Sequence, residues 1–255
     1  MQSKVKSDLE NEEVYYENLC PQEFQQRLDK MPIAYLPLGT LEWHGPHLPL
    51  GADGIQAKEL FYIMARKVGG IVLPPLFVGP DRVFEDGNMK YYGMDINTGG
   101  TVTAYDTQQL LGSAYWVSSP LFEKLLMQIM QQLHRAGFKV IIGHGHGPSI
   151  NSFQAIKRKV KNKWGMELYT AWDFAKEERL KFQNDHAGAN ETSIMMALKP
   201  ELVHIQEVKD KSQLIGVAGG NPLEMASIEY GQQIIRHTLE NMEKCLKKEC
   251  DFLKM

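Results

Sequence analysis

Five of the eight histidines lie in three short segments that are rich in glycine. Four of them form close pairs, His44 with His47 and His144 with His146, and the fifth is His186. Histidine is a common metal ligand and can transfer protons near neutral pH. Each segment lies at or near the end of a predicted strand, and in an open α/β sheet the carboxyl ends of the strands form the ligand crevice. The three segments can therefore meet at one site.

The first segment, residues 37–53, is rich in glycine and proline and begins in an apolar run. Glu42 and His44 are two residues apart, and residues i and i+2 of an extended chain point to the same side. Asp53 comes just before a predicted helix, where a carboxylate is favoured. One interpretation makes Asp53 a helix cap and His44 a hydrogen-bonded loop histidine. The three residues together favour the other interpretation, in which Glu42, His44 and Asp53 bind a metal ion.

The second segment, residues 143–148, reads Gly-His-Gly-His-Gly-Pro and directly follows an apolar strand. Glycines let the chain bend tightly and let a ligand approach closely. Histidines combined with carboxylates suit Zn²⁺, Mn²⁺ or Fe²⁺. A buried structural histidine is the alternative, but two histidines in a glycine-rich strand exit favour metal binding. We therefore predict that His144 and His146 are metal ligands and that Gly145 lies against the substrate.

The third segment, residues 185–193, contains His186 and leads into a predicted helix. Asn190 has the character of a helix cap, and Glu191 falls in the first helical turn. Glu191 can simply complement the helix dipole. It can equally be a ligand or an orienting carboxylate at the crevice, and the pattern alone leaves both roles open.

The sequence lacks the motifs of other common chemistries. It has no Gly-x-Ser-x-Gly, no cysteine beside the histidines, no Walker A motif and no Gly-x-Gly-x-x-Gly at a strand–helix turn. Nucleophilic serine or cysteine catalysis and nucleotide binding of these kinds are therefore not indicated.

The three segments together resemble the creatininase family. Residues 37–53 are similar to the family's Leu-Pro-x-Gly-x-x-Glu-x-His-Gly-Pro-His-Leu-Pro-x-x-x-Asp signature almost throughout. Residues 143–145 resemble its Asn-Gly-His-x-x-Asn turn, and residues 185–193 resemble its His-Ala/Gly-Gly-x-x-Glu-Thr-Ser segment. The resemblance implies a three-layer αβα sandwich with a mostly parallel central sheet, amide hydrolysis of cyclic amides or formamides, and a homo-oligomer, with a hexamer favoured.

The resemblance also implies two divalent metal ions per chain. Its metal ligands fall on Glu42, His44, Asp53 and His144, with Asp53 bridging, and its catalytic histidine falls on His186. Where creatininase has a second glutamate ligand this chain has His146, so the second ion takes His146, Glu191 or both. Trp172 resembles the first of two tryptophans that close over creatinine, and the second has no counterpart, so creatinine itself is not the predicted substrate.

These observations predict a metal-dependent hydrolase of a C–N amide bond in a small molecule. A metal-activated water attacks the carbonyl carbon, His186 protonates the leaving nitrogen, and Glu191 assists. Trp172 packs against the substrate, and His47 orients Glu42 or His44. Two alternatives remain: an isomerase or deformylase reaction on the same metals, and a metal that only stabilises an oligomer.

The elements that position these segments alternate along the chain. Apolar runs predict strands at residues 33–38, 71–73, 139–142, 167–171 and 202–205. Helical spacing predicts helices at residues 22–30, 54–68, 121–136, 150–164, 191–198 and 226–253. This alternation is typical of a parallel sheet with helices on both faces. We expect one domain over residues 19–255 after an N-terminal arm of residues 1–18, and an irregular segment at 74–118 that is functional or an interface.

The composition fits an ordinary globular protein of 255 residues, with 43% hydrophobic residues and a net charge of −3. Without a basic excess no nucleic-acid partner is expected, and the basic run at residues 157–163 is predicted to be a solvated helix face. Three scattered cysteines indicate reduced thiols, and no apolar run is long enough for a membrane span or a signal peptide. We therefore expect a cytoplasmic enzyme with a small-molecule substrate and no membrane partner.

Overall fold

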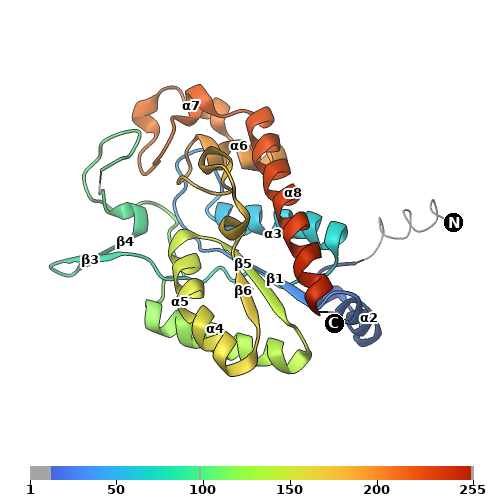
Figure 1. The fold of residues 1–255 in the computed structure, drawn as a ribbon. Coiled ribbons are helices and arrows are strands. Elements are labelled where there is room, and N and C mark those ends of the chain that lie inside the picture. The colour runs from blue at the N-terminus through green and yellow to red at the C-terminus, as the bar shows by residue number, and fades with distance from the viewer. Residues whose placement is uncertain (1–12, 98, 254–255) are drawn as a thin grey trace.

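A four-stranded parallel sheet forms the centre of the protein (Figure 1). The structure is a computed structural model that describes residues 13–97 and 99–253. The strand order is β2 (Ile71–Val72), β1 (Ile33–Leu38), β5 (Val140–Gly145) and β6 (Glu167–Tyr169). All six residues of β1 are buried, as expected of a parallel strand that is covered on both faces.

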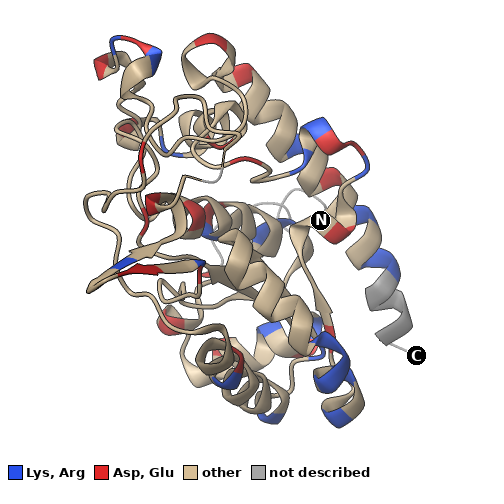
Figure 2. Cartoon of the chain, turned by 90° about the vertical axis from the view of Figure 1, so that its left-hand side faces the viewer, with Lys and Arg blue, Asp and Glu red and all other residues tan. Residues whose placement is uncertain are grey.

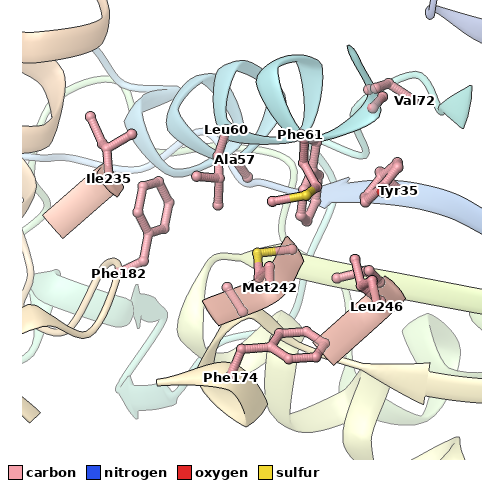
Figure 3. Close-up of a cluster of buried hydrophobic side chains, with 14 of the residues drawn as sticks. Tyr35, Ala57, Leu60, Phe61, Val72, Phe174, Phe182, Ile235, Met242 and Leu246 are labelled. Atoms are coloured by element: carbon pink, nitrogen blue, oxygen red, sulfur yellow. The ribbon is translucent and has the colours of Figure 1, made fainter. Parts of the chain in front are cut away.

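Helices cover both faces of the sheet. The helices α4 (Ser119–Ala136) and α5 (Gly147–Trp164) pack with Leu36 and Ile141 on one face. The helices α3 (Ala52–Val68), α6 (Ala189–Leu198) and α8 (Ile228–Leu253) pack with Tyr35 on the other face. Figure 3 shows this second cluster, in which Tyr35 and Phe61 lie near Met242. The two apolar layers confirm the αβα sandwich.

The outer elements complete the chain. The helix α2 (Pro21–Lys30) precedes β1, and the short α7 (Pro222–Met225) precedes α8. The strands β3 (Val83–Asp86) and β4 (Met89–Tyr92) form an antiparallel hairpin that projects from the body in Figure 1. This hairpin lies in the segment predicted to be irregular. None of the helices in the described ranges is long and apolar enough to cross a membrane.

Most predicted elements are confirmed, and one strand is wrong. Residues 202–205 form no strand; Leu202 ends the 3₁₀ turn Pro200–Leu202, and Ile205 begins the 3₁₀ turn Ile205–Glu207. Their apolar residues instead join a separate cluster with Val208 and Leu214, away from the sheet. The predicted strand at 167–171 is also shorter, because Ala171 begins a 3₁₀ helix.

The N-terminal boundary needs a correction as well. Residues 1–12 of the expected arm lie outside the described residues. Val14, however, is buried in the core, and Tyr15 makes a parallel bridge to Val72. Among the described residues, Val14 and Tyr15 therefore already pack against the domain, ahead of residue 19.

The basic run on α5 is a solvated helix face, as predicted. Its residues Arg158, Lys159, Lys161 and Lys163 are exposed, whereas Ile156 before the run and Val160 within it are buried. In Figure 2, Lys and Arg residues gather on helices at the lower end of the view, and both signs of charge occur elsewhere.

Candidate metal centre

The candidate site lies where β1 and β5 end side by side. Leu38 and Gly145 are paired across these two strands. After β1 the chain passes through a tight loop that contains Glu42 and His44 and then enters α3, which carries Asp53 in its first turn. His146 directly follows β5 and is the N-cap residue of α5.

Glu42, Asp53 and His146 form one group of potential metal ligands. His146 Nδ1 lies 3.3 Å from Glu42 Oε2 and 3.3 Å from Asp53 Oδ2. All three residues are buried. Two carboxylate oxygens and an imidazole nitrogen are a donor set that suits zinc, manganese or iron.

His44, Asp53 and Glu191 form a second group beside the first. His44 Nε2 lies 3.4 Å from Asp53 Oδ2 and 3.8 Å from Glu191 Oε2. Asp53 therefore belongs to both groups, and it faces both histidines through the same oxygen. Glu191 comes from the first turn of α6.

Hydrogen bonds to the two histidines favour one free nitrogen on each ring. His44 Nδ1 is 3.0 Å from the Glu42 backbone oxygen, so it donates there and leaves the Nε2 lone pair facing Asp53. His146 Nε2 is 3.2 Å from the Pro80 backbone oxygen, so it donates there and leaves Nδ1 facing the carboxylates. Metal-binding histidines commonly use their second nitrogen in this way.

The group fits a cation because buried polar atoms lack partners. Glu42 Oε2 and His44 Nε2 are buried and accept no hydrogen bond within the described chain. Leaving such atoms unpaired is costly. A divalent cation bound by each group would engage both atoms.

The pKa shifts of the site carboxylates also favour a bound cation. Burial alone would raise the pKa of Glu42, but the neighbouring His186 and His146 outweigh it and lower the pKa to about 2. Burial and the charges of Asp53 and Asp185 raise the pKa of Glu191 well above its ordinary value. At Glu191 the neighbouring carboxylates thus disfavour a further negative charge, and a bound metal cation would offset this repulsion.

His186 reaches the same region from a different segment. Its Nδ1 lies 3.9 Å from Glu42 Oε2, and its ring lies 4.3 Å from that of His44, measured between centroids. Its Nε2 is 2.8 Å from the Trp43 backbone oxygen. Glu42, His44 and His186 also satisfy the distances of a ligand group. Geometry alone is therefore compatible with a ligand as well as with a proton carrier.

His144 is the expected ligand that the structure does not bring into any of these groups. The strand β5 continues to Gly145, beyond its predicted end at residue 142, so His144 remains inside the sheet opposite Pro37. Its Nε2 lies 3.3 Å from the Phe182 backbone oxygen, and burial lowers its pKa to about 4. His146, two residues further on, occupies the strand end instead.

Gly145 lines a cavity beside the ligand groups, and the backbone conformation at this position requires a glycine. Its φ is +142°, and a Cβ atom there would overlap the carbonyl oxygen of Leu38. That oxygen accepts a hydrogen bond from the His146 backbone N–H at 2.6 Å. Gly145 therefore allows the close approach that places His146.

His47 connects the loop after β1 to α6. Its Nε2 donates to Thr192 Oγ1 at 2.9 Å, and this bond ties the loop to α6, the helix that carries Glu191. Burial lowers the pKa of His47 to about 4. The hydrogen bond found for its side chain goes to Thr192 rather than to Glu42 or His44.

Three polar residues near the site were not predicted. Asp81 Oδ2 lies 3.4 Å from His146 Nε2, and Gln183 donates to Asp53. Asp185 accepts the backbone N–H groups of Asn190 and Glu191 and so caps α6. Asp185 stands beside His186 in the third segment, whereas Asp81 and Gln183 lie in irregular chain with no sequence pattern to single them out.

A cavity of about 430 Å³ opens beside the ligand groups. Its outer wall includes Asp81, Arg82 and Met94 from the irregular segment, together with Trp172. Trp172 Nε1 donates to the Phe182 backbone oxygen at 2.7 Å, which fixes the indole ring. The space is suited to a small molecule.

Comparison with known proteins identifies the family. The Creatininase family profile, described as creatinine amidohydrolase, matches residues 17–246. The chain belongs to the creatininase family. It is therefore a hydrolase of a metal-dependent amidohydrolase family, as the sequence predicted.

Individual members of the creatininase family are distant in sequence. Creatinine amidohydrolase of Pseudomonas putida is 24% identical over 197 residues, which cover 70% of this chain and 68% of the relative. The 3-dehydro-scyllo-inosose hydrolase of Thermotoga maritima is 25% identical over 203 residues. That match covers 75% of this chain but only 58% of the relative's own length.

Solved structures of creatininases share the fold. A crystal structure of creatinine amidohydrolase has a TM-score of 0.68 at 18% identity and covers 94% of this chain and 98% of that chain. A creatininase structure described as the Mn form has a TM-score of 0.67 at 18% identity, with 93% and 99% covered.

Proposed function

We propose that this chain hydrolyses a C–N amide bond of a small molecule with the help of two divalent metal ions. Glu42, Asp53 and His146 would hold one ion, and His44, Asp53 and Glu191 the other. The observation that carries the proposal is Asp53 Oδ2, which lies 3.4 Å from His44 Nε2 and 3.3 Å from His146 Nδ1. A single carboxylate oxygen thereby joins two ligand groups, each of which still has an unpartnered buried atom, Glu42 Oε2 or His44 Nε2.

Zn²⁺, Mn²⁺ or Fe²⁺ in such a site supplies Lewis acidity and brings the pKa of water toward neutrality. Each group offers three protein ligands, which is typical of catalytic rather than structural sites because a position stays open. The adjoining cavity gives a substrate access to that position. This openness favours an enzyme over a metal that only stabilises an oligomer.

His186 is the residue that we assign to proton transfer. Its Nε2–H is engaged by the Trp43 backbone oxygen, so Nδ1 carries the free lone pair. Nδ1 faces the Glu42 carboxylate, and His186 lines the cavity. A histidine in this position can take a proton at Nδ1 and give it to the leaving nitrogen, which must be protonated to depart.

The cavity of about 430 Å³ limits the size of the substrate, and the proposed amide class is the one that the family resemblance implies. By their names, the relatives act on creatinine, on an inosose and, in the 22%-identical mycofactocin precursor peptide peptidase of Mycobacterium ulcerans, on a peptide. We propose a cyclic amide or formamide of small size, with Trp172 and Gly145 in contact with it. We further propose a cytoplasmic homo-oligomer, with a hexamer favoured.

Creatinine is the substrate that we expect to fail. Between residues 172 and 186 the only aromatic residues besides Trp172 are Phe174 and Phe182, and both are buried in the core. No second aromatic ring of this segment is therefore free to close over the substrate. We expect a kcat/KM for creatinine below about 10⁴ M⁻¹s⁻¹, the lower end of the usual enzyme range.

The experiment combines metal analysis with a substrate screen. Protein purified without chelator is analysed for Zn, Mn and Fe per chain. The same sample is then assayed on cyclic amides, formamides and creatinine, with isomerase and deformylase products also monitored. Two ions per chain with turnover of an amide would support the proposal. Metal without turnover of any amide, together with an isomerised product, would favour the alternative reaction.

A further inference from the structure

Gln183 has a backbone conformation that a glutamine seldom adopts. Its φ is +53°, in the left-handed region that favours glycine. The side chain is nevertheless 96% buried, since its exposed fraction is 4%. Such strain persists where the surroundings hold the residue in place, and it occurs often at functional sites.

The side chain of Gln183 is held by Asp53. Its Nε2 lies 3.1 Å from the Asp53 backbone oxygen and 3.2 Å from Asp53 Oδ1. The amide NH₂ group has two hydrogens, and both can be donated to these two acceptors. The reverse orientation of the amide would place Oε1 against a carboxylate, so the contact also fixes which way the amide points.

Because of this contact, the two oxygens of the Asp53 carboxylate face different partners. Oδ1 accepts from Gln183, while Oδ2 faces His44 Nε2 and His146 Nδ1. We propose that Gln183 is a positioning residue that orients Asp53 so that Oδ2 serves both ligand groups. The inference rests on the proposed function, because it concerns the same two groups.

The other end of the Gln183 amide, the Oε1 atom, is left without a partner beside the site. Gln183 Oε1 is buried and has no hydrogen-bond partner within the described chain, and Gln183 lines the cavity. An unpaired buried acceptor is costly to the fold. The chain tolerates this cost, and the backbone strain, at the one place where the amide reaches Asp53.

The test measures metal affinity in two variants of Gln183. Gln183→Met keeps the length of the side chain but removes the donor. Gln183→Glu keeps the shape, removes the donor and brings a like charge to Asp53. Metal-free protein is titrated with Mn²⁺ or Zn²⁺ in a calorimeter. We expect a loss of affinity of roughly 10- to 100-fold for Gln183→Met, as is typical when a residue that orients a ligand is removed, and a larger loss for Gln183→Glu.

Asn190→Ala is the matched control. Asn190 is also buried and holds the same stretch of chain, since it donates to the Lys181 backbone oxygen and accepts from the Asn184 N–H. Its side chain bonds none of the ligand residues. Its loss should lower the thermal midpoint but leave metal affinity unchanged. The visible spectrum of Co²⁺-loaded protein should change in Gln183→Met and stay the same in Asn190→Ala.

The outcomes separate this inference from the proposed function. Wild-type affinity and an unchanged Co²⁺ spectrum in both Gln183 variants, with a lower thermal midpoint as in Asn190→Ala, would show that Gln183 only stabilises the fold. Wild-type protein that takes up no ion would contradict the proposed function instead. If Gln183→Met does not fold, metal affinity and the Co²⁺ spectrum are measured on Gln183→Asn instead, because its amide falls one methylene short of Asp53. A loss of affinity then supports the positioning role, and wild-type affinity contradicts it.

Discussion

The cavity has two walls that are built in different ways. The sheet wall consists of Glu42, Asp53, His146 and Glu191, all at least 97% buried. Glu42 lies in the loop after β1, His146 follows β5, and Asp53 and Glu191 lie in first helical turns. The segment wall consists of Asp81, Arg82 and Met94, which lie in the irregular chain next to the projecting hairpin, and Arg82 is exposed.

The difference lies in what supports each wall. The strands and helices under the sheet wall pack into the two large apolar clusters on either face of the sheet. The hairpin next to the segment wall has no comparable apolar cover within the described residues, since Val83, Phe84 and Met89 are exposed. Burying charged groups is costly, so the reacting groups need the rigid wall. We infer that the segment wall can vary in sequence and so adjust substrate choice.

Asp53→Ala should have the largest effect. Since Asp53 Oδ2 lies in both ligand groups, we expect the variant to lose both ions and all detectable turnover. Elemental analysis of the purified variant, beside wild-type protein, checks this. Two ions per chain in Asp53→Ala would contradict the bridging role, and one ion would show that Asp53 serves only one group.

The next largest effect is expected in metal content, which should fall in His146→Ala but not in His144→Ala. His146 contributes Nδ1 to the first ligand group, whereas His144 donates to the Phe182 backbone oxygen inside the sheet. We expect His146→Ala to lose the ion of that group and its activity. His144→Ala should keep its metal and lose only stability. The metal content and the thermal midpoint of both variants test this expectation. Metal loss in His144→Ala alone would show that His144 is the ligand, as the sequence suggested.

The positions of these two histidines show which features of the fold the sequence predicts and which it does not. Residues Ile33–Leu38 form a strand as predicted, because an apolar run between a proline and a glycine has few other solutions. The strand end at His144 could not be located, since glycine and histidine alternate there and both histidines lie on the same side of an extended chain. A shift of two residues therefore leaves the pattern unchanged while it changes which histidine reaches the site.

The remaining site residues also divide into those that a local sequence pattern predicts and those that it does not. Glu42, His44, Asp53 and Glu191 follow predicted strands or begin predicted helices, and the structure brings them together. Asp81 and Gln183 come from irregular chain and contact residues 65 and 130 positions away. Such contacts depend on how the whole chain folds, and no local pattern predicts them.

His186→Ala should have a smaller effect, confined to turnover. If His186 only transfers protons, the variant keeps its ions and its fold, and kcat falls by about 10²- to 10⁴-fold. The measurement is metal content and kcat on the same preparation, once a substrate is found. Loss of metal would make His186 a ligand, in keeping with its place beside Glu42 and His44. Full turnover would remove it from the mechanism.

The smallest effect is expected in the hairpin of the segment wall. Phe84 is 48% exposed and stacks on Tyr91, at 6.1 Å between ring centroids, whereas Phe61 on α3 is fully buried in the core. Phe84→Ala should therefore change the free energy of unfolding by no more than about 0.5 kcal/mol. Phe61→Ala should cost about 3–5 kcal/mol. Urea denaturation of both variants measures the difference.

The same Phe84→Ala sample tests whether the segment wall is independent of the sheet wall. Because the hairpin contributes nothing to the ligand groups, we expect wild-type metal content and an unchanged molar mass by light scattering. A loss of stability as large as that of Phe61→Ala would mean that the hairpin is supported after all. A fall in molar mass would show the support to be a second copy of the chain, and the two walls would then differ only in which subunit buries them.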